Sequence, residues 1–479
     1  MPVVSNVTCP VCGSFCDDIE ITVKNDVIVK VKNACAMGEA KFLNYASHRQ
    51  TKPLIRKNGE LVEVSLKEAV QKAAEILASA KYPILYGWSN TSCEAIRVGL
   101  ELAEEVGGVI DNTSTVCHGP SILSIQDIGI SSCTLGQLRH RADLIFYWGS
   151  NPWSAHPRHI DRYTTFAEGR FQKSAWRGYL SRLTGILSKK RLHRAVNLGL
   201  GRQTPSPPET ELRLPSTLLQ NKRKMIVVDV RKTRSAEIAD YFLQVKPNKD
   251  YELLQALRML VRDEELDVDK VTGIPVETLE EIVEIMIGCE LGILFFGLGL
   301  TMSQGKHRNI DAALSLVRDL NRRTKFLIMP MRGHFNVTGV NVVFTWQTGY
   351  PYAVDFSHGY PRYNPGETSV VDILCRGESD AALVVASDPV AHFPNVAAQK
   401  LVEKPLVVID PQVTPTSIMA DVVIPSAFVG IEVEGTAYRM DHVPLPLKKV
   451  VEPPTTCLSD KEVLQKILGE VRRLRRNHN

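Results

Sequence analysis

Four cysteines near the N-terminus have the spacing of a metal site. Cys9, Cys12 and Cys16 form a C-x-x-C-x-x-x-C run, and Cys35 follows after eighteen intervening residues. Four thiolates can surround a [4Fe–4S] cube or a tetrahedral zinc ion. Zinc ribbons favour paired C-x-x-C knuckles, so gaps of two and then three residues favour the iron–sulfur cluster. The spacing alone leaves both metals open.

Two further motifs carry reactive side chains. Cys117 precedes His118 at the start of an apolar, helix-like stretch, where a thiol is expected to have a lowered pKa and to serve as a nucleophile or metal ligand. Arg332 and His334 occur in MRGHFNVTG, and an arginine suits a carboxylate or CO2-like substrate because it keeps its charge and offers a fork of donors. Taken alone, the first motif also fits a buried thiol and the second a surface salt bridge.

Turn residues after the apolar runs predict a nucleotide-like ligand. Glycines there let the backbone approach a ligand, and aspartates end runs where Rossmann folds place the acid that grips a ribose or base edge. No G-x-G-x-x-G follows a predicted strand, which argues against an ordinary NAD site. The candidate cofactor-binding residues are Gly87, Gly149, Asn151, Asp229, Thr233, Gly297, Gly299, Asp388 and Asp410.

Eight short apolar runs predict the strands that position these residues. Each ends in a turn and precedes a helix-like stretch, which is typical of a parallel sheet covered on both faces. We therefore expect a doubly wound α/β fold. The runs are residues 83–88, 144–148, 225–230, 292–296, 326–331, 381–386, 406–410 and 422–425.

An internal repeat predicts two related lobes. GSNPWSAHP (149–157) is echoed by ASDPVAHFP (386–394), and VVDVRKTRSAEIAD (227–240) by VIDPQVTPTSIMAD (408–421). The first copy carries 56 more residues between its two motifs, which matches a basic stretch at 171–224. The repeat indicates two Rossmann-like lobes, the first interrupted by an insert.

Composition indicates a folded, water-soluble protein. The chain has 479 residues, 44% hydrophobic and 23% charged, with a net charge of +4, which excludes disorder for most of it. The longest apolar run, 291–302, is shorter than the roughly 20 residues of a membrane span. The N-terminus shows no export signal, so we expect the ten cysteines to lie in a reducing cytoplasm.

The basic insert holds the positive charge. Residues 171–224 contain twelve Lys and Arg and two Glu, and the rest of the chain sums to −6, which argues against a nucleic-acid function for the whole protein. From Trp176 an apolar stripe at helical spacing predicts a basic amphipathic helix. An acidic partner subunit, an anionic membrane or self-packing would each fit, and we favour the subunit.

Taken together, the motifs resemble a known family. The chain resembles the tungsten- or molybdenum-containing catalytic subunits of formylmethanofuran dehydrogenase, which are similar to bis-pterin formate dehydrogenases. The resemblance covers nearly the whole chain outside the insert. It rests on CPVCGSFCDDIE, CAMGEAKF, TVCHGP, WGSNPWSAHPRH, VDVRKT, FLQVKPNKDYELL, RGHFNVTG, SDPVAHFPN and EVEGTAYRMD.

The resemblance implies a role for each motif. It implies that the four N-terminal cysteines hold a [4Fe–4S] cluster, that Cys117 ligates W or Mo, and that His118 carries a proton and Arg332 anchors substrate. It places Lys41 between cluster and pterin. The implied cofactor is W or Mo with two pyranopterin guanine dinucleotides, one per lobe.

The resemblance also implies a reaction, partners and a domain plan. The reaction is reversible reduction of CO2 to formate in archaeal C1 metabolism. The implied partners are an amidohydrolase-like zinc subunit, a pterin-barrel subunit and ferredoxin-like electron carriers. Alternatives are a stand-alone formate dehydrogenase or other bis-pterin oxidoreductase, and a non-catalytic scaffold. The expected domains are 1–55 for the cluster, 56–112 with 327–450 and 113–326 for the lobes, and a helical tail at 451–479.

Overall fold

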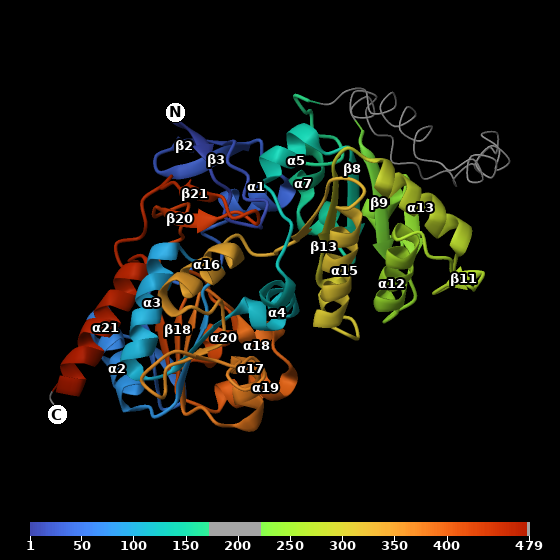
Figure 1. Ribbon diagram of the computed structural model, residues 1–479. Helices are drawn as coiled ribbons and strands as arrows, with labels where there is room; N and C mark the ends of the chain where they lie inside the picture. The colour runs from blue at the N-terminus through green and yellow to red at the C-terminus, as the bar shows by residue number, and fades with distance from the viewer. Residues whose placement is uncertain (172–221, 477–479) are drawn as a thin grey trace. The chain divides into compact units, whose positions relative to one another are not determined.

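The computed structural model describes residues 1–171 and 222–476, so the basic insert and its expected amphipathic helix fall almost wholly outside the described residues. The chain forms two compact units, Met1–Ile122 with Arg332–Asn479 and Leu123–Met331 (Figure 1). In the described ranges no helix combines the length and apolar character needed to cross a membrane.

The main sheet of the first unit is parallel at its centre and antiparallel at its edges. Its order is β16-β15-β7-β6-β17-β18-β19-β4-β5, with β7, β6, β17, β18 and β19 parallel. The strands are β4 (Leu54–Lys57), β5 (Glu60–Glu63), β6 (Pro83–Gly87), β7 (Val109–Asn112), β15 (Val354–Asp355), β16 (Arg362–Tyr363), β17 (Ala381–Val385), β18 (Leu406–Ile409) and β19 (Val422–Ile424).

Helices cover both faces of this sheet because its central strands alternate between two apolar clusters. Leu383 and Val385 pack with one group of helices, whereas Ala382 and Val384 pack with the other. The first group, whose α21 packs against α2 and α3 (Figure 1), is α2 (Leu66–Ser79), α3 (Cys93–Val106), α16 (Val337–Thr348) and α21 (Asp460–Arg476). The second group includes α17 (Val370–Arg376) and α19 (Asn395–Val402), with the short α18 (Pro389–His392) and α20 (Pro415–Met419) nearby.

Smaller elements of the first unit carry the candidate reactive residues. The antiparallel sheet β1-β2-β3 and helix α1 pack on Phe428 and Ile431. A short 3₁₀ helix η1 follows β7, and helix α4 leads into the second unit. The bounds are β1 (Val3–Val7), β2 (Ile19–Lys24), β3 (Val27–Lys32), α1 (Ala36–Leu43), η1 (Thr113–Val116), α4 (Gly119–Ile128) and the hairpin β20 (Gly435–Tyr438) and β21 (Pro444–Leu447).

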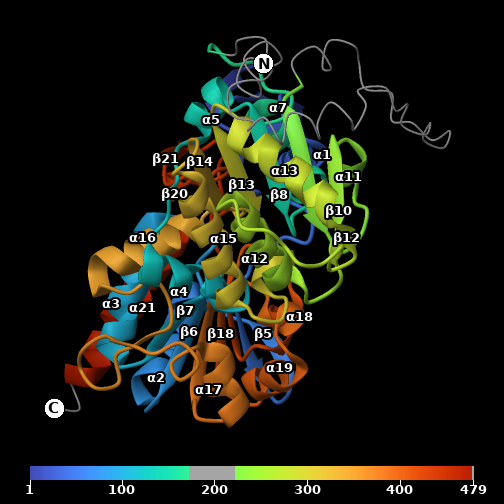
Figure 2. The same cartoon turned by 45° about the vertical axis from the view of Figure 1, so that its right-hand side comes forward.

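The second unit has a five-stranded, fully parallel sheet in the order β10-β9-β8-β13-β14. Helices α12, α13 and α15 cover one face (Figure 2), and Tyr147 and Phe295 stack on the other beside His159 of α7. The strands are β8 (Leu144–Trp148), β9 (Lys224–Asp229), β10 (Tyr241–Gln244), β13 (Gly292–Phe296) and β14 (Phe326–Pro330), with a small hairpin β11 (Lys270–Val271) and β12 (Ile274–Pro275). The helices are α5 (Leu135–Arg141), α6 (Pro152–Ala155), α7 (Pro157–Arg162), α11 (Arg234–Glu237), α12 (Asp250–Val261), α13 (Val276–Gly288), α14 (Leu298–Thr301) and α15 (His307–Leu320).

The predicted α/β class with parallel sheets is confirmed. Every one of the eight predicted runs forms a parallel strand, namely β6, β8, β9, β13, β14, β17, β18 and β19. The pattern did not indicate β7 and β10, which join the parallel sheets, or the antiparallel edge strands. These strands are short and several are half exposed, so they lack a continuous apolar run.

Arg223 holds the two flanks of the basic insert together. Its backbone N donates to Thr165 O at 2.9 Å, so the described segments on either side of residues 172–221 lie side by side at this point. Its buried guanidinium donates to the carbonyls of Leu138, Arg139, Tyr163 and Ala167. The guanidinium thus adds a donor to two carbonyls of the last turn of α5, to that of Tyr163 at the end of α7 and to that of Ala167.

Arg223→Met should therefore destabilise the second unit. The change keeps an apolar stem but leaves four carbonyls without this donor, which should cost about 3 kcal/mol. Thermal unfolding of the purified chain should shift down by several degrees, whereas the exposed Arg170→Met should unfold as the parent does. Equal midpoints for both variants would contradict a role for these bonds.

Candidate functional site

The four N-terminal cysteines converge in one loop cluster. Cys9 N donates to Cys16 O at 2.8 Å, and Cys35 is the residue that immediately precedes α1. A Cβ on Gly38 would lie 3.1 Å from Cys9 Sγ and 3.9 Å from Cys35 Sγ. Burial raises the pKa of Cys9 well above its usual value, and the charges of the other three thiols raise it further. The four sulfurs are close enough that ionised thiolates repel one another, which a shared cationic group would relieve.

Cys12 shows the same pattern. Burial, and then the charges of Cys16 and Cys35, raise the pKa of its thiol to about 11, although hydrogen bonds from Ser14 oppose the shift. Within the described ranges, no group of three or more His, Cys, Asp or Glu side chains is placed to hold a single metal ion. The cluster of four thiols is a structural finding, while its occupant remains a prediction.

The cysteine loop is attached to the segment that carries Arg332. Gly13 N donates to Gly333 O at 3.1 Å, and Cys12 forms a β-bridge with His334. A Cβ on Gly13 would lie 2.3 Å from Arg332 O, so only glycine permits this approach. The two motifs, far apart in sequence, thus share one backbone junction within the first unit.

Cys117 and Arg332 lie within electrostatic reach of each other. Cys117 ends η1, and burial raises the pKa of its thiol to about 11 although the Arg332 guanidinium opposes this. Arg332 is 4% exposed. Burial lowers the pKa of its guanidinium to about 10, although Cys117 opposes this shift. The guanidinium therefore stays charged at neutral pH. His118 is fully buried beside Cys117, with Nδ1 at 3.2 Å from Ser121 Oγ.

The direction expected for the pKa shift of the Cys117 thiol was wrong. Its place before α4 and beside His118 predicted a lowered thiol pKa, but desolvation outweighs the helix terminus and the neighbouring cation. The thiol of the chain alone is therefore protonated at neutral pH. It becomes a good ligand only for a cation strong enough to displace its proton.

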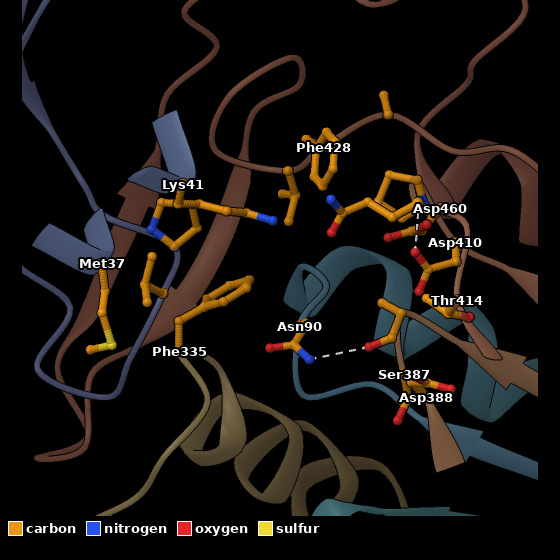
Figure 3. A pocket seen from close by; sticks show the side chains of 17 residues that line it. Met37, Lys41, Asn90, Phe335, Ser387, Asp388, Asp410, Thr414, Phe428 and Asp460 are labelled. Carbon is orange, nitrogen blue, oxygen red and sulfur yellow. Dashed lines mark hydrogen bonds between the residues drawn. The ribbon is translucent and has the colours of Figure 1, made fainter. Parts of the chain in front are cut away.

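A cavity of about 470 Å³ opens in the first unit where β6, β17 and β18 end. The parallel strands run β7-β6-β17-β18-β19, so chain order reverses between β6 and β17, the point at which open α/β sheets bind ligands. Figure 3 shows Asn90, Asp388 and Asp410 on its walls. Asp410 is 7% exposed, and burial raises its pKa to about 7, with Lys41 opposing the shift.

Lys41 reaches into this cavity from α1 (Figure 3). Its Nζ lies 4.3 Å from the ring centre of Phe428. Burial lowers its pKa, whereas the nearby Asp410 and Cys9 favour its charged form. Lys41 thus lies within electrostatic reach of the cysteine cluster on one side and of the cavity on the other.

The internal repeat is confirmed at the level of hydrogen bonds. In the second unit Ser235 Oγ bonds Asn151 Oδ1 at 2.7 Å and accepts from Trp153 N at 3.2 Å. In the first unit Thr416 Oγ1 bonds Asp388 Oδ1 at 2.5 Å and accepts from Val390 N at 3.1 Å. The turn after β8 is therefore built like the turn after β17.

The second pair of repeated motifs agrees as well. Met225 N donates to Asp240 Oδ2 at 2.7 Å, and Leu406 N donates to Asp421 Oδ2 at 2.9 Å. Thr233 caps α11 as Thr414 caps α20, which gives the repeated threonine a structural role. Asp229 and Asp410 each accept a hydrogen bond from the backbone two residues on.

The candidate glycines pack closely against backbone atoms of other turns and strands. Gly149 has φ of +55°, and a Cβ on it would lie 2.7 Å from Gly299 C, while Gly299 N donates to Gly149 O at 2.9 Å. A Cβ on Gly87 would lie 2.1 Å from Val385 O, and one on Gly297 2.7 Å from Gly149 O. Close packing of turns explains all four glycines, and a ligand beside them stays a prediction.

The structure places the candidate residues in two sets. The first unit holds the cysteine cluster, Cys117, His118, Arg332 and the cavity residues, while the second holds Gly149, Asn151, Asp229, Thr233, Gly297 and Gly299. Sequence reasoning missed Asn341, which accepts a hydrogen bond from Arg332 Nη1. It also missed His442. Burial, and to a lesser extent the positive charge of Arg332, lower the pKa of this imidazole to about 4. Neither residue carries a spacing signal, because each reaches Arg332 only through the fold.

Comparison with known proteins assigns a class. The molybdopterin oxidoreductase family matches residues 49–178 and 206–470. The B subunit of tungsten-containing formylmethanofuran dehydrogenase 2 from Methanocaldococcus jannaschii is 48% identical, with 98% of this chain and 99% of that protein covered. Its counterpart from Methanococcus maripaludis is 45% identical at the same coverage.

Among solved structures, a chain of the formyltransferase/hydrolase complex from Methylorubrum extorquens, solved with methylofuran, aligns with a TM-score of 0.66 at 19% identity over 87% of this chain and 98% of that one. That likeness shows the fold. The chain belongs to the molybdopterin oxidoreductases and, within them, to the B subunits of tungsten-containing formylmethanofuran dehydrogenase. It is thus an oxidoreductase component of a multi-subunit complex.

Proposed function

We propose that this chain reduces CO2 to formate, reversibly, at a W or Mo centre with two pyranopterin guanine dinucleotides, as the redox subunit of formylmethanofuran dehydrogenase. The observation that carries the proposal is the half-buried Cys117 thiol beside the buried, charged Arg332 guanidinium. A soft sulfur ligand and a fixed cation for a carboxylate are the two groups that this reaction needs from the protein.

The donor set fits the proposed metal. A desolvated thiol with a pKa of about 11 is a poor nucleophile at neutral pH, but metal coordination deprotonates a thiol outright. Arg332 would then face a thiolate ligand and hold a carboxylate on its donor fork. When bound, the metal and its pterins supply the two-electron redox chemistry.

The chain's own residues would orient the substrate and hold a proton. Arg332, buried and charged, would hold the carboxyl oxygens on which negative charge develops. The buried His118 imidazole, oriented by its contact with Ser121 Oγ, would hold the proton that the reaction consumes or releases. Burial excludes bulk water from both groups and so strengthens their electrostatic effect.

The four N-terminal cysteines would hold a [4Fe–4S] cluster through which electrons enter. The mutual proximity of the four thiols supports a shared cationic group. Lys41, within electrostatic reach of Cys9 and of the cavity, would lie between the cluster and a pterin.

Each unit would form a Rossmann-like lobe that binds one dinucleotide. The duplicated turns support this, because the same hydrogen bonds hold Asn151 in one unit and Asp388 in the other. In the first unit, the cavity at the reversal of strand order would take one nucleotide, with Asp410 on its wall. In the second, the turns with Gly149, Gly297 and Gly299 would serve the other.

The proposed setting is a cytoplasmic complex. The partners would be a zinc amidohydrolase-like subunit that receives formate, a subunit with the pterin barrel, and ferredoxin-like carriers. The basic segment 171–224 is proposed as the docking site for an acidic partner of this kind.

His118→Ala should keep the metal but slow turnover. General acid–base help is worth about 10²- to 10⁴-fold in rate, so formate oxidation with an artificial dye should fall by that factor while W or Mo content stays at the parental level. The matched control is His358→Ala, an exposed histidine of the first unit, which should behave as the parent. Parental turnover of His118→Ala across pH would show that the histidine is structural. Purified complex that holds neither W nor Mo would favour the scaffold alternative instead.

A further inference from the structure

A buried amide connects Arg332 to the loop that ends at Cys117. Asn341 lies on α16 and is 7% exposed. Its Oδ1 accepts a hydrogen bond from Arg332 Nη1. Its Nδ2 donates to Ser114 Oγ at 2.9 Å and to Pro351 O at 2.9 Å. One side chain therefore accepts from the arginine and donates to two other loops.

The connection continues to Cys117. Ser114, fully buried in η1, accepts a hydrogen bond at its carbonyl O from Cys117 N at 3.0 Å. Asn112 Oδ1 accepts from Ser114 N at 3.0 Å, and Asn112 Nδ2 donates to Pro351 O at 3.1 Å. A continuous path of hydrogen bonds runs from Arg332 through Asn341 and Ser114 to the backbone of Cys117.

Only a side-chain amide of this size suits position 341. An amide both accepts and donates, whereas a carboxylate of the same size cannot donate to Ser114 Oγ and Pro351 O at once. A carboxylate would also compensate the Arg332 charge, which a neutral acceptor does not do. Buried networks in which each group is satisfied hold side chains in one arrangement.

We propose that Asn341 is a positioning residue that orients the Arg332 guanidinium relative to Cys117, so that Arg332 can hold a carboxylate-sized substrate close to that sulfur. The inference rests on the proposed function for the identity of that substrate. The inference that Asn341 orients Arg332 rests on the hydrogen bonds alone.

The test compares Asn341→Ala with Asn321→Ala in the purified, metal-loaded complex. Asn321 likewise donates two hydrogen bonds from its amide, in its case to the carbonyls of Val317 and Phe326, but it belongs to the second unit and to no proposed site. Three quantities are measured: the rate at which phenylglyoxal modifies Arg332, followed by peptide mass spectrometry; W or Mo content; and kcat and KM for formate oxidation with an artificial dye.

In Asn341→Ala, Arg332 should react several-fold faster, metal content should stay parental, and kcat/KM for formate should fall about 10- to 100-fold, the cost of a reacting group misplaced by about 1 Å. Asn321→Ala should match the parent in all three. An unchanged Arg332 modification rate would overturn the proposal, as would metal loss in parallel with activity, which would make Asn341 a support of the Cys117 loop only.

If Asn341→Ala does not fold, Ser114→Ala tests the proposal instead. This change removes only the hydrogen bonding between the side chains of Asn341 and Ser114, which connects Asn341 to the Cys117 loop. It should change the modification rate and kcat/KM in the same direction but less, and no change in either would overturn the proposal. A parent enzyme that does not oxidise formate would refute the proposed function, while the modification rates would still test the hold on Arg332.

Discussion

Cys117→Ala is expected to abolish interconversion of formate and CO2. The thiol is the sulfur that the chain places beside the buried Arg332, and alanine cannot ligate a metal. X-ray absorption at the W or Mo edge should count one sulfur neighbour fewer than in the parent. Turnover with an artificial dye should fall to background, even though His118 and Arg332 remain.

Cys375→Ala is the matched control, since this exposed cysteine of the first unit lies outside the proposed site. It should keep both the sulfur count and the turnover of the parent. If Cys117→Ala also kept both, Cys117 would be an ordinary buried thiol and the metal would take its protein ligand elsewhere.

Cys12→Ser should block electron entry while leaving part of the chemistry at the metal. Removing one of four convergent thiols should empty or degrade the cluster, because a serine hydroxyl is a poor ligand for iron. Iron should fall from about four atoms per chain toward zero. Activity with the physiological electron donor should be lost, and formate oxidation with a dye that reaches the metal directly should persist in part.

Cys457→Ser provides the comparison for this experiment. Cys457 is a buried thiol of the same unit, 3% exposed and bonded to Gln50 O at 3.8 Å, apart from the four cysteines. It should retain iron and activity with both donors. Anaerobically purified parent protein that contained one zinc per chain and no iron would refute the cluster and restore the zinc alternative.

The strands were predictable because their information is local. A parallel strand buried on both faces needs a continuous apolar run, and each of the eight runs forms one. The repeat was predictable because each motif is a short run of residues, although the hydrogen bonds that hold the turns join separate runs, such as Ser235 to Asn151. The antiparallel strands β15 and β16 are each two residues long, so no period in the sequence marks them.

The electrostatics of the site could not be predicted from the motifs. A cysteine before a helix suggested a lowered pKa at Cys117, but its depth below the surface reverses the shift. Likewise the glycines after the strands suggested a ligand, whereas turns packed against turns explain them, as at Gly149 and Gly299. Burial and close approach depend on segments that sequence spacing does not bring together.

Residue type, apolar runs and short motifs are local properties, so the sequence was enough to propose candidate residues and to predict eight of the parallel strands and the two copies of one turn design, but not β7, which leads to Cys117. Which of these residues meet depends on the tertiary structure. Ser114 and Asn341 are 227 positions apart, yet hydrogen bonds between their side chains join them beside Arg332. Such contacts arise when separate segments pack into one core, and burial then sets the charge state of what they enclose.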